Sequence, residues 1–247
     1  MTRGRLLIGL VVTGITAAAW VAWAPPAWLL NMLPALFPGC LYRVQTAAPM
    51  VALTIDDGPD PATTPRLVAE LERHQAHATF FLLSSRVKGQ EGLVHQLVTA
   101  GHEVGNHLTE DAPSMALSPA DFELALREAH RVLAPFGPVR WARPSSGWYS
   151  RAMITIMRRN GYRCALGSVY PYDAIVPSAG FATSFILRNA GPGAIVILHD
   201  GGQRGRRSVE VLRNVLPTLR RRGFQVVTLS ELVRTAGSRR TAHVGTP

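Results

Sequence analysis

Short hydrophobic and β-branched runs recur along the middle of the chain, and amphipathic segments separate them. Seven runs have the length and composition of strands: Val51–Ile55, Ala78–Leu83, His102–Gly105, Val139–Ala142, Arg163–Gly167, Ala194–Leu198 and Gln225–Thr228. The helical spacing of apolar residues marks segments between them, among them Pro65–Arg73, Ala120–Leu133 and Val209–Arg222. Alternating strands and helices predict parallel β/α units. No GxGxxG follows the first strand, which favours a barrel-like sheet over a dinucleotide-binding fold.

The N-terminal end of the chain has a different pattern. Leu6–Ala24 is an uncharged stretch of 19 residues, close to the ~20 residues that cross a bilayer. Two arginines precede it, which predicts a cytoplasmic N-terminus and an exported remainder. A cleaved signal peptide is the alternative, but a proline directly after the small-residue end of the stretch disfavours cleavage. We therefore expect residues 1–24 to form a transmembrane anchor.

The rest of the chain divides by composition. Residues 25–49 are apolar and interrupted by prolines, so we expect a collar or linker along the membrane or on the domain. Residues 50–235 hold the β/α pattern and form one domain, and residues 236–247 form a short polar tail that we expect to be flexible. The two cysteines, Cys40 and Cys164, could form a disulfide in an exported protein, although nothing in the sequence requires one.

The positive charge is concentrated near the C-terminus. The 247 residues contain 26 Lys and Arg against 16 Asp and Glu, a net charge of +10. From residue 204 to the end there are ten Arg and two Glu, so this part carries most of the excess. No aromatic residues interleave with these arginines and no nucleic-acid-binding motif is present, so we expect no nucleic-acid partner. The charge fits a solvated helix face, or attraction to an anionic polymer or lipid head groups.

Polar residues cluster where the predicted strands end, which is where parallel β/α sheets gather their functional groups. Asp56 and Asp57 follow the first strand, His107 the third, Arg143 the fourth, and His199 closes the sixth. Taken one at a time, these residues have ordinary explanations. An Asp before Gly-Pro is turn chemistry, and a single histidine is more often structural.

Together the clusters suggest metal-assisted hydrolysis. Asp57, His107 and Asp111 make three ligands, the number that a catalytic zinc-type site uses while it leaves a position for water. Asp56 is the candidate base for the water proton, and His199 the candidate acid for the leaving group. Glu110 is a rival to Asp111 as third ligand.

Four ordered motifs carry a resemblance to the polysaccharide deacetylase family (carbohydrate esterase family 4, NodB-homology domain). They are Thr54-Ile55-Asp56-Asp57-Gly58-Pro59, Gly101-His102-Glu103-Val104-Gly105-Asn106-His107, Arg143-Pro144-Ser145-Ser146-Gly147 and Leu198-His199-Asp200. The resemblance spans residues 51–232. It implies a distorted (β/α)7-type barrel preceded here by the transmembrane helix, and hydrolysis of N-acetyl or O-acetyl groups on a sugar polymer.

The resemblance also implies roles for individual residues. Asp56 would be the base, Asp57 and His107 metal ligands, and His199 the acid that protonates the departing amine. Arg143 would hold the base carboxylate, and Asp173 resembles the family carboxylate that orients the catalytic histidine. The implied cofactor is one divalent metal, with zinc favoured over cobalt, nickel or manganese.

The sequence departs from the family pattern at three places. The second metal histidine of the family is Asp111 here. A carboxylate in its place makes the donor set harder and more anionic, which favours cobalt, nickel and manganese more than the family pattern does. A Pro-Tyr pair is replaced by two serines; the backbone N–H of Ser146 could still serve as oxyanion donor, and Trp148 or Tyr149 could supply the lost aromatic surface. The segment around Asp173 lacks the family's first Asp and its Trp.

Three functions follow in order of preference. The first is a metal-dependent deacetylase of an envelope polysaccharide such as peptidoglycan or a chitin-like glycan, held at the outer face of the cell membrane. The second is hydrolysis of a small amide, imide or other acyl substrate by the same groups. The third is a non-catalytic, membrane-tethered glycan-binding protein.

Overall fold

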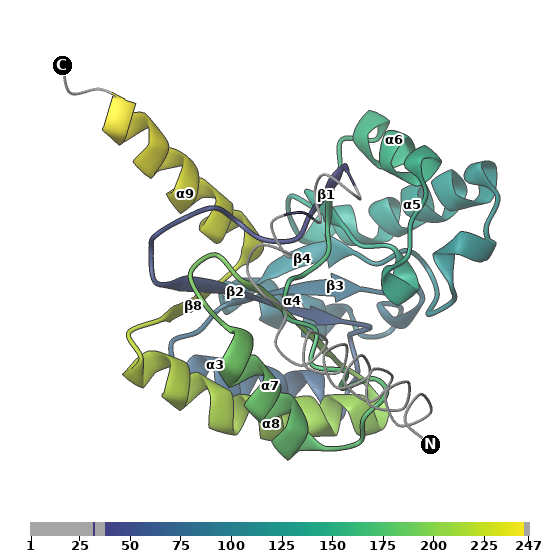
Figure 1. Ribbon diagram of the computed structural model, residues 1–247. Helices are drawn as coiled ribbons and strands as arrows, with labels where there is room; N and C mark the ends of the chain where they lie inside the picture. Colours follow the sequence, from purple (N-terminus) through teal and green to yellow (C-terminus); the bar gives the residue numbers. More distant parts are fainter. Residues whose placement is uncertain (1–31, 33–37, 245–247) are drawn as a thin grey trace, which may run out of the picture.

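The computed structural model describes Met32 and residues 38–244, and within them eight strands and seven α-helices form one α/β unit (Figure 1). The strands are β1 (Cys40–Leu41), β2 (Met50–Asp56), β3 (Ala78–Leu82), β4 (Glu103–Asn106), β5 (Trp141–Ala142), β6 (Arg163–Ala165), β7 (Ile195–His199) and β8 (Gln225–Val227). They pair in the order β1-β6-β5-β4-β3-β2-β7, and β8 also pairs with β2. All of these pairs are parallel.

The seven predicted strands are all present, with bounds that shift by two residues at most. The reason is the continuous burial of the central strands. Every residue of β2 and β3 is buried, so apolar residues predominate on both faces of each strand instead of alternating with exposed polar ones. Such runs are easy to recognise when turn residues bound them.

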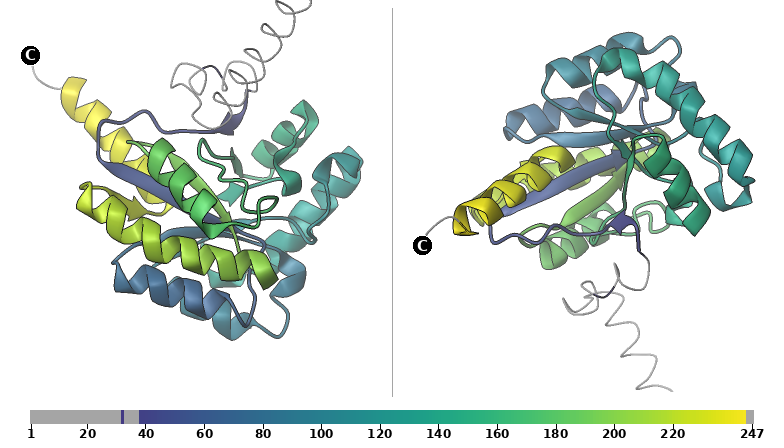
Figure 2. Two further views of the ribbon diagram at one scale, coloured as in Figure 1. Left: turned by 60° about the horizontal axis from the view of Figure 1, so that its bottom comes forward. Right: turned by 90° about the horizontal axis from the view of Figure 1, so that it is seen from above.

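The sheet curls, so that its distant strands approach each other (Figures 1 and 2). Val169, shortly after β6, forms an isolated parallel bridge with Val196 of β7. The fold class is therefore a curled parallel sheet with helices around it, a half-barrel form of the barrel that the sequence predicted. The predicted transmembrane segment, residues 1–24, lies outside the described residues. None of the helices within the described part has both the length and the hydropathy to cross a membrane.

The helices cover the outside of the curled sheet (Figures 1 and 2). They are α3 (Thr64–Arg73), α4 (Glu91–Thr99), α5 (Pro119–Leu133), α6 (Arg151–Arg159), α7 (Ala179–Asn189), α8 (Gly202–Arg221) and α9 (Leu229–Val244). Helix α8 packs against both α3 and α7, and α5 packs against α6. Serine side chains cap α5, α6 and α7, where Ser118, Ser150 and Ser178 each accept a backbone N–H from the first helical turn.

Helix α8 begins earlier than its apolar pattern predicted. The expected start was Val209, because the glycines before it are typical of a loop, whereas the helix begins at Gly202. Gly205 has a packing reason: a Cβ there would lie 2.5 Å from Thr63 Oγ1. This close approach holds the first turn of α8 against the segment that follows β2.

The two ends of the described chain compare differently with the sequence-based expectation. The second half of the predicted collar, residues 38–49, packs on the domain, which is one of the two arrangements expected: β1 pairs with β6, and Arg43 bridges to Ala194 beside β7. A disulfide joins Cys40 to Cys164, with their Cα atoms 4.7 Å apart. At the other end α9 continues to Val244, so most of the predicted flexible tail is helical.

Candidate active site

The predicted site residues lie at the carboxyl ends of neighbouring strands. Asp56 ends β2, His107 directly follows β4, Arg143 follows β5 and His199 ends β7. Asp57 has a positive φ of 72°, a backbone conformation that is costly for a residue with a side chain. Strain of this kind persists only where the surrounding structure enforces it. Here the strained residue is the second of two adjacent aspartates, and the two carboxylates contact different partners.

Asp56 is held by a buried arginine. Arg143 Nη1 donates to Asp56 Oδ1 at 2.5 Å and to Thr54 Oγ1 at 2.9 Å, and its Nε donates to the Ala165 carbonyl at 2.9 Å. The guanidinium carbon lies 4.1 Å from the centroid of the Phe81 ring. Both charged side chains are almost fully buried. The arginine therefore has a fixed geometry, and it supplies the counter-charge that a buried carboxylate needs.

Asp57 faces His107. Asp57 Oδ1 lies 3.4 Å from His107 Nε2, and Asp56 Oδ2 lies 3.9 Å from the same nitrogen. His107 Nδ1 is 2.7 Å from the Arg143 carbonyl oxygen, so Nδ1 must be the donor. Burial by itself would lower the pKa of His107, but the two carboxylates raise it. Burial would raise the pKa of Asp57, but His107 and nearby positive charges lower it.

Asp111 does not join this pair directly. Its Oδ2 lies 3.5 Å from Arg204 Nη2, while Arg204 Nη1 lies 2.9 Å from Asp57 Oδ2. Within the described residues, no three His, Cys, Asp or Glu side chains are grouped so that they could share one metal ion. The predicted three-ligand set is thus only partly assembled, because a guanidinium connects its two carboxylates. For the rival ligand, Glu110, the backbone carbonyl is 3.3 Å from Ser145 Oγ.

The donor chemistry nonetheless fits a divalent metal. Asp57 and His107 converge through a carboxylate oxygen and an imidazole nitrogen, and the Nδ1–H bond directs Nε2 toward the carboxylate. Asp57 and Asp111 already share one cation, the Arg204 guanidinium. Carboxylate and imidazole donors suit zinc as well as cobalt, nickel and manganese.

His199 forms a second charge pair on the other side of Asp56 and Asp57. Its Nδ1 lies 2.9 Å from Asp173 Oδ2, and its backbone N–H donates to the same oxygen at 3.1 Å. Burial would lower the pKa of His199, but the hydrogen bond and charge of Asp173, with the charges of Asp56 and Asp57, raise it to about 9. An imidazole with such a pKa is charged at neutral pH.

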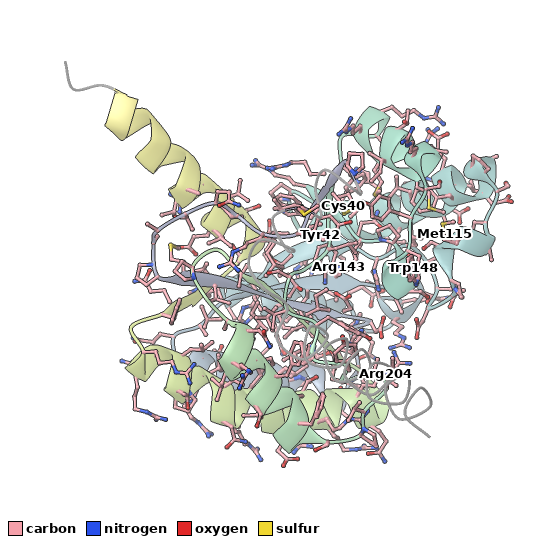
Figure 3. The ribbon with its side chains drawn as sticks, in the orientation of Figure 1. Cys40, Tyr42, Met115, Arg143, Trp148 and Arg204 are labelled. Carbon is pink, nitrogen blue, oxygen red and sulfur yellow. A yellow bond between two sulfur atoms is a disulfide. The ribbon has the colours of Figure 1, made fainter. Side chains whose placement is uncertain are left out.

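Ser146 and Trp148 lie in the turn that follows β5. Ser146 has a φ of 68° and is exposed, and Trp148 is 70% exposed (Figure 3). The neighbouring Ser145 is buried, and its Oγ donates to the His107 carbonyl at 3.3 Å. This bond fixes the turn beside the His107 segment. The exposed indole is available to a large ligand.

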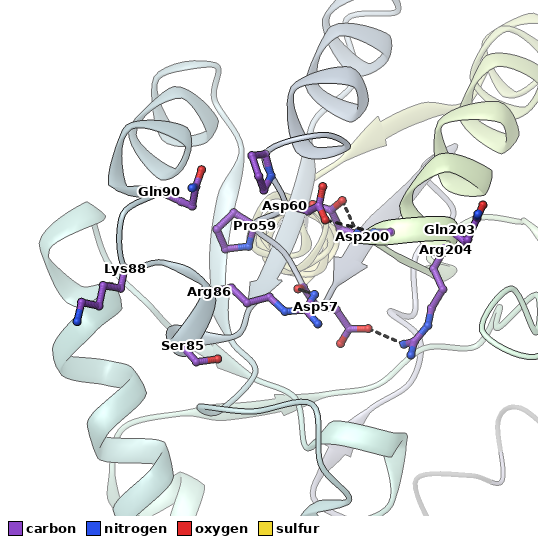
Figure 4. Close-up of a pocket in the computed structure, with 13 residues that line it drawn as sticks. Asp57, Pro59, Asp60, Ser85, Arg86, Lys88, Gln90, Asp200, Gln203 and Arg204 are labelled. Atoms are coloured by element: carbon purple, nitrogen blue, oxygen red, sulfur yellow. Dashed lines mark hydrogen bonds and ion pairs between the residues drawn. The ribbon is translucent and has the colours of Figure 1, made fainter.

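A cavity of about 540 Å³ opens beside Asp57 (Figure 4). Residues that sequence reasoning did not single out line it. Arg86 donates to the Asp57 carbonyl at 2.7 Å, and Arg204 reaches the Asp57 carboxylate. Asp200 accepts hydrogen bonds from the Thr63 and Thr64 hydroxyls, and burial raises its pKa. Asp200 lies next to His199 in the sequence, and Arg204 lies in the segment 201–208 that follows His199 and was expected to flank the site, whereas nothing in the sequence pointed to Arg86.

Comparisons with known proteins show which proteins this chain resembles. Residues 43–165 match the polysaccharide deacetylase family. The chain is 32% identical over 197 residues to a peptidoglycan-N-acetylglucosamine deacetylase of Bacillus cereus, covering 78% of this chain and 92% of that one. It is 32% identical over 202 residues to a chitooligosaccharide deacetylase of Sinorhizobium fredii, covering 76% and 94%.

A solved structure shows the same likeness in three dimensions. The peptidoglycan deacetylase PdaC of Bacillus subtilis superposes with a TM-score of 0.72 at 27% identity, over 81% of this chain and 96% of that one. The sequence likeness covers most of both chains, and the structural likeness includes the curled sheet that carries the site. This chain belongs to the polysaccharide deacetylase family.

Proposed function

We propose that the protein is a metal-dependent deacetylase of an N-acetylated envelope glycan, either peptidoglycan or a chitin-like polymer. The observation that carries the proposal is the arrangement of two charge pairs, Asp56–Arg143 and His199–Asp173, around Asp57. One pair presents a carboxylate and the other a protonated imidazole. Amide hydrolysis needs both a proton acceptor and a proton donor in one site.

Asp57 and His107 are the residues that would hold the metal, and Asp111 is the third donor that we propose. A bound divalent metal supplies Lewis acidity and lowers the pKa of water from 15.7 to about 7. Asp111 in place of a neutral histidine makes the donor set more anionic, which favours cobalt, nickel or manganese alongside zinc.

Asp56 accepts the proton of the attacking water in this mechanism. Arg143 binds only Oδ1 of the carboxylate, and the other oxygen faces the Asp57–His107 pair. The guanidinium fixes the direction of the other carboxylate oxygen of Asp56. The orientation of the base is therefore set before substrate binds, which lowers the entropic part of the barrier.

His199 donates a proton to the departing amine. A pKa of about 9 keeps the imidazole protonated at neutral pH. Asp173 fixes the ring through Nδ1, so the proton on Nε2 is the one that can be delivered.

The turn after β5 is where we place contacts to the substrate. The backbone N–H of Ser146 is the proposed oxyanion donor, and Trp148 is the proposed platform for a sugar ring. The exposure of the indole supports this role, because aromatic faces bind the apolar faces of large ligands. The printed names of the B. cereus and S. fredii relatives support a glycan substrate.

Acetate release tests the function. Protein stripped of metal and reloaded with Zn²⁺ or Co²⁺ should release acetate from N-acetylglucosamine oligomers or peptidoglycan. The Asp56→Asn variant should bind metal as the wild type does but lose most turnover, whereas Glu128→Gln, at an exposed site on α5, should be fully active. Release only from small amides or imides would indicate the second function considered above. No release with any metal would refute catalysis.

We also propose that the domain works outside the cytoplasm, tethered by residues 1–24. The uncharged N-terminal stretch supports this, and so does the disulfide between Cys40 and Cys164, because disulfides persist mainly in oxidising compartments. Protease added to intact cells should degrade the domain while the N-terminal segment stays with the membrane fraction. A domain that is protected until the cells are lysed would contradict the proposed location.

A further inference from the structure

Arg204 connects two carboxylates of the proposed metal site. Its Nη1 lies 2.9 Å from Asp57 Oδ2, and its Nη2 lies 3.5 Å from Asp111 Oδ2. Figure 4 shows the first of these contacts, with the arginine side chain reaching across to the aspartate. The second oxygen of Asp57 faces His107. The guanidinium therefore engages an oxygen of each carboxylate that the sequence assigned to the metal.

The main chain of Arg204 is held in place, while its side chain is partly exposed. The Gly201 N–H donates to Thr63 Oγ1 at 3.2 Å, and Gly205 packs so closely on Thr63 that no Cβ would fit. These contacts fix the first turn of α8. The Arg204 side chain itself is 40% exposed, and it borders the cavity beside Asp57, which has room for another position of the guanidinium.

The contact differs from an ordinary surface ion pair. The Asp57 side chain is only 4% exposed, so its charge is poorly hydrated and depends on partners in the protein. Exposed pairs contribute little because water competes with both partners. Here only the arginine is well hydrated, and it meets a carboxylate that has no comparable alternative in solvent.

We propose that Arg204 is a built-in cation that competes with the divalent metal for Asp57 and Asp111. An oxygen that accepts a guanidinium N–H cannot direct the same lone pair at a metal ion. The guanidinium holds the two carboxylates together when no metal is bound, and it withdraws toward the cavity when the metal takes them. The inference rests on the proposed function in one respect, the use of Asp57 and Asp111 as metal donors.

Direct metal binding tests the proposal without any measurement of activity. The metal-stripped full chain is titrated with Zn²⁺ and with Co²⁺ by calorimetry. Arg204→Met keeps the length of the side chain but removes its charge and donors. We expect this variant to bind metal at least about tenfold more tightly than the wild type, because it loses a charge-assisted contact that competes for the same oxygens.

The matched control is Arg206→Met. Arg206 lies in the same helical turn, is exposed, and contacts Gln203 rather than the carboxylates. The Arg206→Met substitution also removes one positive charge, so it measures how much the loss of that charge alone changes the metal affinity. We expect its metal affinity to stay within about twofold of the wild type, because a distant exposed charge is screened by salt.

Three results would overturn the inference: an unchanged or weaker affinity in Arg204→Met, an equal gain in Arg206→Met, or no metal binding by any of the proteins. Acetate release by the wild type decides the proposed function separately. If the wild type releases acetate but Arg204→Met binds metal with unchanged affinity, the competition is refuted and the deacetylase proposal is supported. If Arg204→Met binds metal more tightly but no substrate releases acetate, the competition is supported and the deacetylase proposal is refuted.

Discussion

The pairing of His199 with Asp173 predicts a large change in a single substitution, Asp173→Asn. Asp173 receives two hydrogen bonds from His199, one from the ring and one from the backbone. An asparagine oxygen can still accept these hydrogen bonds, so the ring position should be kept. What the variant loses is the negative charge that holds the proton on the imidazole.

The magnitude follows from the pKa of His199. Its rise from 6.5 to about 9 corresponds to about 3 kcal/mol in favour of the imidazolium. The side chain is 12% exposed, so solvent screens this interaction only weakly. Asp56 and Asp57 contribute the smaller part and remain in the variant. An adjacent opposite charge shifts a pKa by about 1–3, so we expect the pKa of His199 in Asp173→Asn to fall from about 9 to about 6–8.

Two measurements report this pKa. Proton NMR of the imidazole gives the titration of His199 in metal-free protein, and the alkaline limb of the rate profile reports it during turnover. In the variant both should move to lower pH by a similar amount, and the rate at pH 8 should drop. Stability should respond as well: the wild type gains stability from this pair below pH 6.5 and loses it as the pH rises through about 9, and the variant should lack most of that loss.

The control is Asp60→Asn. Asp60 lines the cavity and accepts backbone N–H groups from residues 62 and 63, which an asparagine can also do, and it makes no hydrogen bond to His199. The titration curve of His199 in the Asp60→Asn variant should match that in the wild type within error. If Asp173→Asn also titrates like the wild type, the charge of Asp173 does not set the pKa, and the assignment of the pair as acid and positioning residue is wrong.

Two further predictions concern buried charge. Arg143→Met should lower the free energy of unfolding by about 3–5 kcal/mol, because it leaves the Asp56 carboxylate buried without its partner; urea unfolding measures this, and an equal loss in an Asp56→Asn background would contradict the pairing. His102 is buried, and burial together with the charge of His77 lowers its pKa to about 4. Stability should therefore fall by about 3 kcal/mol as the pH drops from 6.5 to 4, and His102→Asn should remove that part of the slope in unfolding experiments across this range.

The sequence predicted the strands well because the central ones are buried on both faces. A strand such as β2 is then mostly apolar on both faces, and that signal does not depend on its neighbours. The beginning of α8 was missed for the opposite reason. Its first turn contains Gly202 and Gly205, and the need for glycine at 205 arises from Thr63, far away in the sequence. Local patterns contain no information about such a contact.

The sequence also predicted part of the chemistry of the site. The strand-end rule brought together Asp56, Asp57, His107 and His199, and the structure places them around one centre. The rule says which residues approach one another but not which atoms meet. The partial assembly of the metal donors depends on the reach of one long side chain, and ten arginines follow residue 203 with nothing to distinguish the first.

The roles that we propose for Asp111 and Arg204 depend on each other. A carboxylate at position 111 adds a negative charge that shares Arg204 with Asp57, where a histidine would have added none. Neighbouring carboxylates repel one another unless positive charge lies among them. Arg143 pairs with Asp56, and Arg204 lies against Asp57 and Asp111. The basic C-terminal part of the chain therefore begins with a residue whose charge belongs to the electrostatics of the site. If Arg204 competes with the metal as proposed, the affinity of the site for a divalent metal depends on how much more strongly these carboxylate oxygens bind the metal than the Arg204 guanidinium.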